Sequence, residues 1–236
     1  MFEAVKAVKD RKILVTVKYT DKPAFTSNHF ATSYIYDFGV ALEYIVSKVI
    51  NERKTGGYYM MGHQAELVAW VTSGAPVEIL YAIDVYPAYP ENHGALIGAA
   101  KQGVYYAEFA EKIGFSQDLC SYARCDIGCV VAGTSPIGGL PRPTFLFACN
   151  NICNTVVKWY EVLSRMFKVP LFVLDTPFVR KELKEGYVTY VEEQLYEFID
   201  FVEKITGRQM SDVALRKTLD KSLEAVKLSL IHISEP

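Results

Sequence analysis

The sequence predicts an α/β fold, a doubly wound parallel sheet with flanking helices. Thr144–Ala148 and Leu171–Leu174 are short, unbroken apolar runs, the pattern of strands that are buried on both faces. Asn154–Phe167, which lies between them, has apolar residues at helical spacing. Together they have the length of roughly 30 residues that a crossover between two parallel strands requires. We therefore expect a parallel sheet with helices on both faces.

Length and composition are those of a globular protein. The chain has 236 residues, of which 50% are apolar and 22% are charged, so its main part is not a disordered charged tail. Lys and Arg number 25 against 27 Asp and Glu, a net charge of −2 that gives no bulk attraction to nucleic acid or an anionic membrane. No apolar run reaches the roughly 20 residues that cross a bilayer, and the N-terminus lacks a signal-peptide pattern. We expect a cytoplasmic protein.

The N-terminal segment, residues 1–60, is expected to be partly helical and partly extended. Residues 1–9 and Tyr36–Val49 have apolar positions at helical spacing, whereas Ile13–Lys18 is a β-branched run that is typical of a strand. Thr20–Asn28 is polar and contains a proline, which predicts a loop.

An α/β domain is expected over residues 61–180. In its first half, we predict a helix over His63–Val71, a strand or buried helical turn over Val77–Ile83 and a long helix over Asn92–Ile113. A further helix over Cys120–Val131 and a loop over Gly133–Pro143 follow. Pro87 and Pro90 end the second of these elements, and Gly114 stops the long helix. The strand–helix–strand unit then completes the domain.

The C-terminal part is predicted to be helical. Glu182–Ile205 and Ser211–Lys227 are two helices of a segment that spans 181–228. The last residues, 229–236, are SLIHISEP, which resembles translated sequencing-adaptor sequence. We expect them to be a non-native tail, and a frayed natural terminus is the alternative.

Cysteine is the most informative residue of the composition. All five cysteines fall between Cys120 and Cys153, and an odd number without an export signal argues against a disulfide framework. Cys125 and Cys129 are four residues apart on one face of a predicted helix, so they can pack into the core as small apolar residues. None of the spacings is the tight C-x₂-C of ferredoxins and zinc ribbons.

Two of the cysteines follow a predicted strand at the position where parallel sheets bind ligands. Cys149 and Cys153 come directly after Thr144–Ala148, and ligands of such sheets gather beyond the carboxyl ends of the strands. The first turn of a helix stabilises a thiolate, which is the ligand that soft metals and iron–sulfur clusters require. Cys120 is expected to open a helix of its own. The sequence thus indicates a thiolate-rich edge of the sheet.

Glu91 and His93 are the candidates for catalysis. Both follow a proline-rich turn in YPAYPENH, where an acid and a polar residue can equally serve to cap a helix. Asp175 and Thr176 end the second apolar strand, also at the ligand-binding edge, where a turn-forming role is the alternative. Phosphate-binding loops, dinucleotide fingerprints, nucleophile elbows and HExxH motifs are absent from the sequence.

Several long motifs resemble one known family. The chain is similar to the 2-hydroxyacyl-CoA dehydratase and benzoyl-CoA reductase family in the order and content of PVEILYAIDVYPAYPENH, DLCSYAR, GGLPRP, NNICNTVVKWYE and VPLFVLDTPF. The resemblance covers about half of the chain, from Gly62 to Phe178. It implies two doubly wound α/β domains in each subunit, of which this chain holds the first, and a dimer of related subunits.

The resemblance also implies a [4Fe–4S] cluster that three cysteines bind, so that 61–180 would be the cluster-binding domain. Cys120 in DLCSYAR and Cys153 in NNICNT match two of the ligands, and Cys149 is a further candidate. No cysteine follows Cys153, so the third ligand is expected beyond Pro236. The helical segment would then be a linker towards a second α/β domain.

The chemistry that the resemblance implies is reductive and acts on a coenzyme A thioester. An ATP-dependent iron–sulfur activator would supply one electron to the cluster. In a 2-hydroxyacyl-CoA dehydratase, the resulting ketyl radical of the acyl-CoA expels the hydroxyl group. Three alternatives stay open. The first is a benzoyl-CoA reductase subunit that dearomatises an aryl-CoA, because the proline-rich turn ending in PENH resembles that of such subunits. The others are a partner subunit that binds acyl-CoA without a cluster, and a zinc or redox thiol protein.

Overall fold

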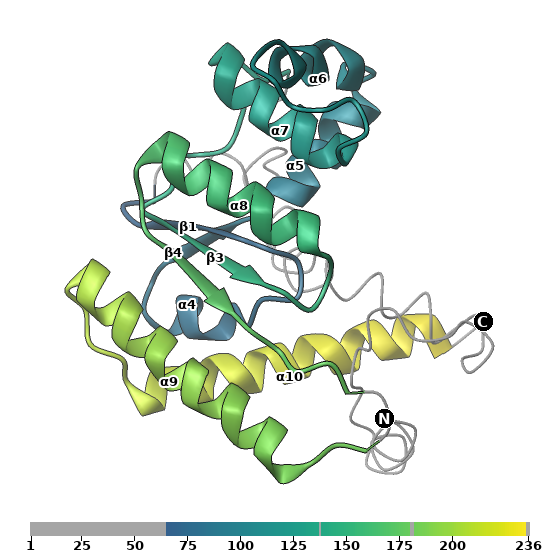
Figure 1. Cartoon of the computed structure of the whole chain (residues 1–236). Helices are drawn as coiled ribbons and strands as arrows, with labels where there is room; N and C mark the ends of the chain where they lie inside the picture. Colours follow the sequence, from purple (N-terminus) through teal and green to yellow (C-terminus); the bar gives the residue numbers. More distant parts are fainter. Residues whose placement is uncertain (1–64, 137, 180–181, 235–236) are drawn as a thin grey trace.

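The computed structural model describes residues 65–136, 138–179 and 182–234. The elements predicted for the N-terminal segment lie outside these ranges. In the described part, the chain folds into a central sheet with helices on either side (Figure 1). No helix of this part is both long and apolar enough to span a membrane.

The centre of the described fold is a sheet whose strands are all parallel. Its members are β1 (Val68–Val71), β2 (Tyr86–Ala88), β3 (Phe145–Cys149) and β4 (Leu171–Leu174). Their order is β2-β1-β3-β4, and each neighbouring pair is parallel. Every residue of the two inner strands, β1 and β3, is buried, which explains why the sequence of β3 is an unbroken apolar run. The predicted fold class is confirmed.

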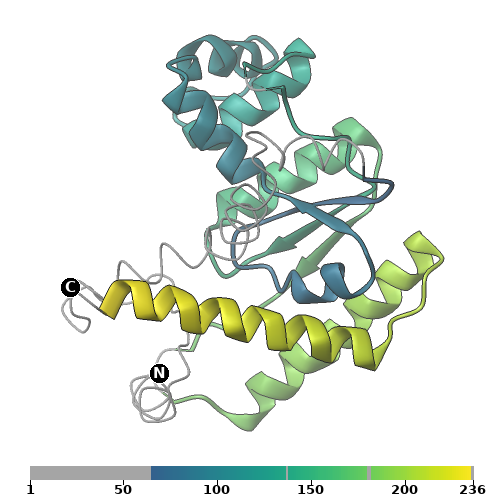
Figure 2. The same ribbon diagram turned by 180° about the vertical axis from the view of Figure 1, so that it is seen from behind.

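Helices cover both faces of the sheet. Helix α8 (Asn154–Phe167) connects β3 to β4 and lies on one face, as Figure 1 shows. The opposite face carries α4 (Glu78–Ala82), α9 (Glu185–Thr206) and α10 (Asp212–Ser234), as Figure 2 shows from behind. Alternate residues of β1 point to the two sides: one buried cluster contains Val68 and Trp70 with residues of α8, and the other contains Ala69 and Val71 with residues of α4 and α9.

Three further helices form a layer beyond α8 (Figure 1). They are α5 (Pro90–Ala99), α6 (Gly103–Lys112) and α7 (Ser121–Ala132). Helices α6 and α7 pack backbone to backbone at Gly128, where an added Cβ would lie 1.8 Å from the carbonyl oxygen of Tyr106. Only glycine fits this contact. The layer has a small buried core of its own, made by Ile97, Tyr106, Ala107, Cys125 and Cys129.

The second half of the predicted elements is confirmed. Helix α8 and strand β4 have the predicted bounds, and α7 begins one residue after the predicted start. Helices α9 and α10 also agree within a few residues at their N-terminal ends, although α10 continues to Ser234, so that residues 229–234 of the expected tail are helical. Val77–Ile83 takes the second of its two predicted forms, the helical turn α4.

Two predictions in the first half are wrong. The described part of His63–Val71 ends in strand β1 instead of a helix, because a four-residue apolar run fits either form and pairing with two neighbouring strands decides between them. The single long helix over Asn92–Ile113 is two helices, α5 and α6, separated at Lys101. Lys101 has φ of 58°, a left-handed conformation that no α-helix can continue through.

Strand β2 was not predicted, because it contains Pro87. Proline has no N–H to donate to a sheet and is confined to edge strands. Strand β2 is such an edge, pairing only with β1 among the described strands. The N–H of Tyr86 donates to the carbonyl oxygen of Leu67 at 2.9 Å. Since backbone N–H groups alternate in direction along a strand, the nitrogen of Pro87 points away from β1.

Candidate functional site

The carboxyl ends of β1 and β3 are tied together by side-chain hydrogen bonds. The hydroxyl oxygen of Thr72 accepts a hydrogen bond from the N–H of Cys149 at 3.0 Å. The Glu91 carboxylate, at the start of α5, accepts one from the N–H of Ser73 at 2.7 Å. Glu91 therefore places an acid in the first turn of α5 and also binds the loop that follows β1. Its half-buried carboxylate lies at the predicted ligand-binding edge.

A second network joins the ends of β3 and β4 to α9. The side-chain oxygen of Asn150 accepts hydrogen bonds from the N–H and the hydroxyl of Thr176, at 2.7 and 2.9 Å, and its amide nitrogen donates to Asp175. The hydroxyl of Tyr190 donates to Asp175 at 2.8 Å, and this hydrogen bond raises the pKa of Tyr190. Asp175 and Thr176 thus connect two strand ends to a helix, which agrees with a structural role.

The five cysteines fall into two groups that differ in exposure. Cys120 is the N-cap of α7, Cys153 is the N-cap of α8, and both are exposed. Cys125, Cys129 and Cys149 are buried. Burial raises the pKa of the Cys125 thiol, and it raises that of Cys129 to about 12. At neutral pH, the two N-cap cysteines are the accessible thiols.

Cys120 and Cys153 offer two donors of the kind that an iron–sulfur cluster uses. Neither side chain makes a hydrogen bond that caps its helix, so neither thiol is committed to that structural role. Nowhere in the described ranges do three His, Cys, Asp or Glu side chains come together as a metal site. The two thiols are donors of the kind that a cluster uses, and they are two of the three cysteines that the resemblance implies. Cys120 and Cys153 stay predicted ligands, and Cys149, which is buried, stays a further candidate.

A buried polar network lies between the helical layer and α8. The Asp126 carboxylate, with 0% exposure, accepts hydrogen bonds from His93 Nδ1 at 2.8 Å and from Trp159 Nε1 at 3.2 Å. His93 Nε2 is 2.9 Å from the hydroxyl oxygen of Ser135. Burial raises the pKa of Asp126, and the hydrogen bond from His93 opposes that rise. Both ring nitrogens of His93 are thus engaged with protein groups, and the side chain is buried.

Tyr160 carries a buried hydroxyl near the Glu91 carboxylate. Among the described residues, its hydroxyl is the buried side-chain polar atom without a hydrogen-bond partner. Its pKa is raised well above 10, first by burial and then by the charges of Glu91 and Asp126. The hydroxyl therefore stays protonated and lies near the carboxylates of Glu91 and Asp126. Such an unpaired buried hydroxyl costs about 1–3 kcal/mol.

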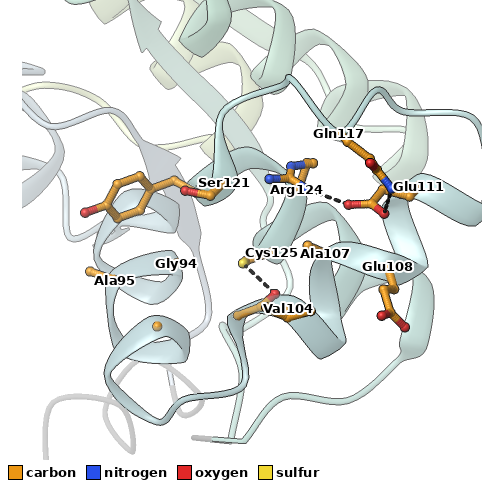
Figure 3. Close-up of a pocket in the computed structure, with 13 residues that line it drawn as sticks. Gly94, Ala95, Val104, Ala107, Glu108, Glu111, Gln117, Ser121, Arg124 and Cys125 are labelled. Atoms are coloured by element: carbon orange, nitrogen blue, oxygen red, sulfur yellow. Dashed lines mark hydrogen bonds and ion pairs between the residues drawn. The ribbon is translucent and has the colours of Figure 1, made fainter.

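A cavity of about 530 Å³ opens between α5, α6 and α7 (Figure 3). Its size is in the range of small-molecule sites. One wall carries the ion pair of Arg124 with Glu111, and Arg124 also donates to the carbonyl oxygen of Leu119 at 3.0 Å. Cys125 donates to the carbonyl oxygen of Gly103 at the floor, at 3.2 Å. The cavity reaches the first turn of α7, directly after Cys120.

Sequence reasoning missed the buried network and Tyr160. Asp126 lies between apolar residues of α7, and Trp159 and Tyr160 lie on the apolar face of α8, so each was counted with its helix. The available signal was the single acid in the apolar stretch CDIGC, because a buried carboxylate must have hydrogen-bond donors around it.

The fold and the edge define a class of protein, the parallel α/β proteins that bind ligands beyond the carboxyl ends of their strands. Residues 72–230 match the family of the 2-hydroxyglutaryl-CoA dehydratase D-component, and the chain belongs to that family. The resemblance seen in the motifs is thereby confirmed.

Curated relatives lie on both branches of the predicted family. The chain is 36% identical over 170 residues to the (R)-2-hydroxyisocaproyl-CoA dehydratase alpha subunit of Clostridioides difficile, which covers 72% of this chain and 42% of that protein. Identity is 33% over 165 residues to the (R)-phenyllactyl-CoA dehydratase alpha subunit of Clostridium sporogenes, covering 70% and 40%. It is 28% over 167 residues to a benzoyl-CoA reductase subunit of Thauera aromatica, covering 68% and 38%. The chain matches about two fifths of the length of these relatives.

Proposed function

We propose that this chain belongs to the iron–sulfur subunit of a 2-hydroxyacyl-CoA dehydratase, an enzyme that eliminates water from a 2-hydroxyacyl-CoA. The observation that carries the proposal is the placement of Cys120 and Cys153, two exposed thiols at the N-caps of adjacent helices. Three dehydratase alpha subunits, at 33–36% identity against 28% for the reductase subunit, favour the dehydratase branch. A fourth dehydratase alpha subunit, that of 2-hydroxyglutaryl-CoA dehydratase from Acidaminococcus fermentans, is 25% identical.

In this proposal, Cys120 and Cys153 hold a [4Fe–4S] cluster with a third ligand from beyond Pro236. When bound, such a cluster supplies the single low-potential electron that turns a thioester into a ketyl radical able to lose its hydroxyl group. The N-cap positions leave both thiols exposed, so both are accessible to a cluster. Cys149 is buried and is the weaker choice.

Glu91 is the group that we assign to proton transfer. Its carboxylate lies at the carboxyl edge of the sheet, and the N–H of Ser73 fixes one of its oxygens. A carboxylate held in this way can take a proton from a bound substrate and return it to a leaving hydroxyl. His93 has both ring nitrogens engaged with Asp126 and Ser135, so we assign His93 a structural role in holding α5 against α7.

The proposal includes the partners of the reaction. We expect a 2-hydroxyacyl-CoA substrate, a related second subunit and an ATP-dependent iron–sulfur activator, all in the cytoplasm. The alpha-subunit names of the dehydratase relatives support the second subunit. The net charge of −2 is consistent with an enzyme that binds neither nucleic acid nor membrane.

The test is anaerobic reconstitution of the complete subunit together with its partner. Iron and sulfide are quantified after reconstitution, and about four irons per subunit are expected. Cys120→Ser and Cys153→Ser should each lower the iron content, whereas Cys129→Ala, which removes a buried thiol, should leave it unchanged. Wild-type protein that retains no iron contradicts the proposal and favours a partner subunit without a cluster.

Activity then separates the two branches. With activator and ATP supplied, we expect turnover of a 2-hydroxyacyl-CoA and none of benzoyl-CoA. The reverse preference would assign the protein to the benzoyl-CoA reductases. Retention of zinc in place of iron, without either activity, would instead indicate a zinc or redox thiol protein.

A further inference from the structure

The two exposed cysteines occupy equivalent positions relative to one buried hydrogen bond. Asp126 lies 126 − 120 = 6 residues after Cys120, and Trp159 lies 159 − 153 = 6 residues after Cys153. Trp159 Nε1 donates to Asp126 Oδ2 at 3.2 Å. Helices α7 and α8 begin on the same side of the molecule (Figure 1), and six residues correspond to about 9 Å along each helix. The hydrogen bond therefore joins matching levels of the two helices.

This hydrogen bond is part of a rigid arrangement. The Asp126 carboxylate is fully buried, and its other oxygen is held by His93 of α5 at 2.8 Å. Trp159 belongs to the same buried cluster as Ala123 and Ile127 of α7. A slide of α7 along α8 by a single residue would move the two groups about 1.5 Å relative to each other. It would leave a buried carboxylate short of a donor, which is strongly unfavourable.

The same arrangement fixes the helices at their N-terminal ends. The indole of Trp159 contacts α7 less than two turns from both N-caps, so rotation or sliding of either helix moves its cysteine directly. Helix α7 is also held on its other side, because Gly128 packs against the backbone of Tyr106. The position of Cys120 relative to Cys153 thus depends on the pairing of Asp126 with Trp159.

We infer that Asp126 and Trp159 are positioning residues that set the separation of the Cys120 and Cys153 thiols. The inference rests on the proposed function in one respect, because a set separation matters for catalysis if the two thiols are ligands of one cluster. A multinuclear cluster needs its thiolates at fixed positions, and a helix pair locked at one level supplies them before any iron binds.

The test measures the proximity of the thiols without any metal. The reduced 236-residue chain is treated with dibromobimane, a reagent that becomes strongly fluorescent when it bridges two thiols, and the rate of bridging is recorded. Cys120→Ser and Cys153→Ser must each abolish the signal. Trp159→Phe removes the indole N–H, and we expect it to lower the bridging rate roughly fivefold or more, the factor that corresponds to one lost hydrogen bond.

Trp70→Phe is the matched control. Trp70 Nε1 donates to the carbonyl oxygen of Pro141 at 2.8 Å, so this variant also loses a buried indole hydrogen bond. Trp70 lies on β1 and not between α7 and α8, and we expect its bridging rate to equal that of the wild type. Equal rates for Trp159→Phe and Trp70→Phe, or no bridging in the wild type, would overturn the inference.

Asp126→Asn keeps the test decisive if Trp159→Phe does not fold. The amide has the shape of the carboxylate but cannot accept from both His93 and Trp159 at full strength, so bridging should again slow. The result is separate from the fate of the proposed function. If Trp159→Phe slows bridging while the complete subunit takes up no iron, the positioning role stands and the cluster proposal fails.

Discussion

Replacement of Tyr160 by phenylalanine should stabilise the protein. The hydroxyl of Tyr160 is fully buried without a hydrogen-bond partner among the described residues, and an unpaired buried hydroxyl costs about 1–3 kcal/mol. Phenylalanine keeps the ring and its buried apolar area, so the cavity that results is smaller than a methyl group. We expect the free energy of unfolding to rise by about 1–2 kcal/mol. In a chain of this length, that corresponds to roughly 2–8 °C in the melting temperature.

The measurement is urea unfolding of Tyr160→Phe, followed by circular dichroism. If the slope of the free energy of unfolding against urea concentration is the same in the variant and the wild type, the gain lies in the folded state. Because the pKa of Tyr160 is raised well above 10, the hydroxyl is neutral in both the folded and the unfolded wild type near pH 7, and the gain should not vary between about pH 6 and 8. Tyr190→Phe is the control, since its hydroxyl has a partner in Asp175; this variant should show no gain.

A loss of stability in Tyr160→Phe would refute this reasoning. It would mean that the hydroxyl donates a hydrogen bond in the folded protein, with the Glu91 carboxylate as the first group to consider. A gain in stability together with a loss of dehydratase activity in the complete enzyme would be informative in another way. It would indicate that the unpaired hydroxyl is retained for the reaction at a cost in stability.

Three further predictions concern the helical layer and the sheet edge. Gly128→Ala should lower the free energy of unfolding, measured in urea, by about 3 kcal/mol or more, because its Cβ would lie 1.8 Å from the carbonyl oxygen of Tyr106. Gly98→Ala is the control: nothing lies within 4 Å of its Cβ, and alanine is the better helix former, so it should leave the free energy of unfolding unchanged or raise it by up to about 1 kcal/mol. The pKa of the Cys129 thiol is raised from 9.0 to about 12 in the folded state, so the unfolded state loses its proton first and the free energy of unfolding should fall as the pH rises above 9. This fall should be smaller in Cys129→Ala than in the wild type, and an equal fall in the two proteins would exclude Cys129 as the cause. Glu91→Gln should reduce the activity of the complete enzyme by about 100-fold or more while changing the free energy of unfolding little, because the amide oxygen can still accept from the backbone N–H; full activity would exclude Glu91 as the proton carrier.

The sequence was sufficient where one local pattern allowed one structure. Strand β3 and helix α8 were predicted because an unbroken apolar run and a helical period are distinct signals. Helix α7 begins one residue after the predicted start at Cys120, and the loop predicted from Gly133 begins at the left-handed C-cap of that helix, with φ of 65°. These elements also carry the predicted cysteines, which is why Cys120 and Cys153 were both expected at helix starts.

The elements that were missed depend on contacts between distant segments. Strand β1 is a strand because it pairs with β2 and β3, and its four residues alone do not show this. The break at Lys101 is set by the packing of α5 and α6 on α7, and no proline marks it. The pairing of His93 with Asp126 joins residues 33 apart in the sequence, so neither pattern nor spacing could indicate that His93 is buried.

Pro87 limits how the protein can associate through its sheet. Among the described strands, β2 lies at the edge of the sheet, and an edge strand is a template on which another strand can add. The nitrogen of Pro87 points outward from β2 and carries no hydrogen, so a continuous ladder of hydrogen bonds cannot form along that edge. Pro87 therefore limits strand addition at this edge of the described sheet, whichever segment lies against it.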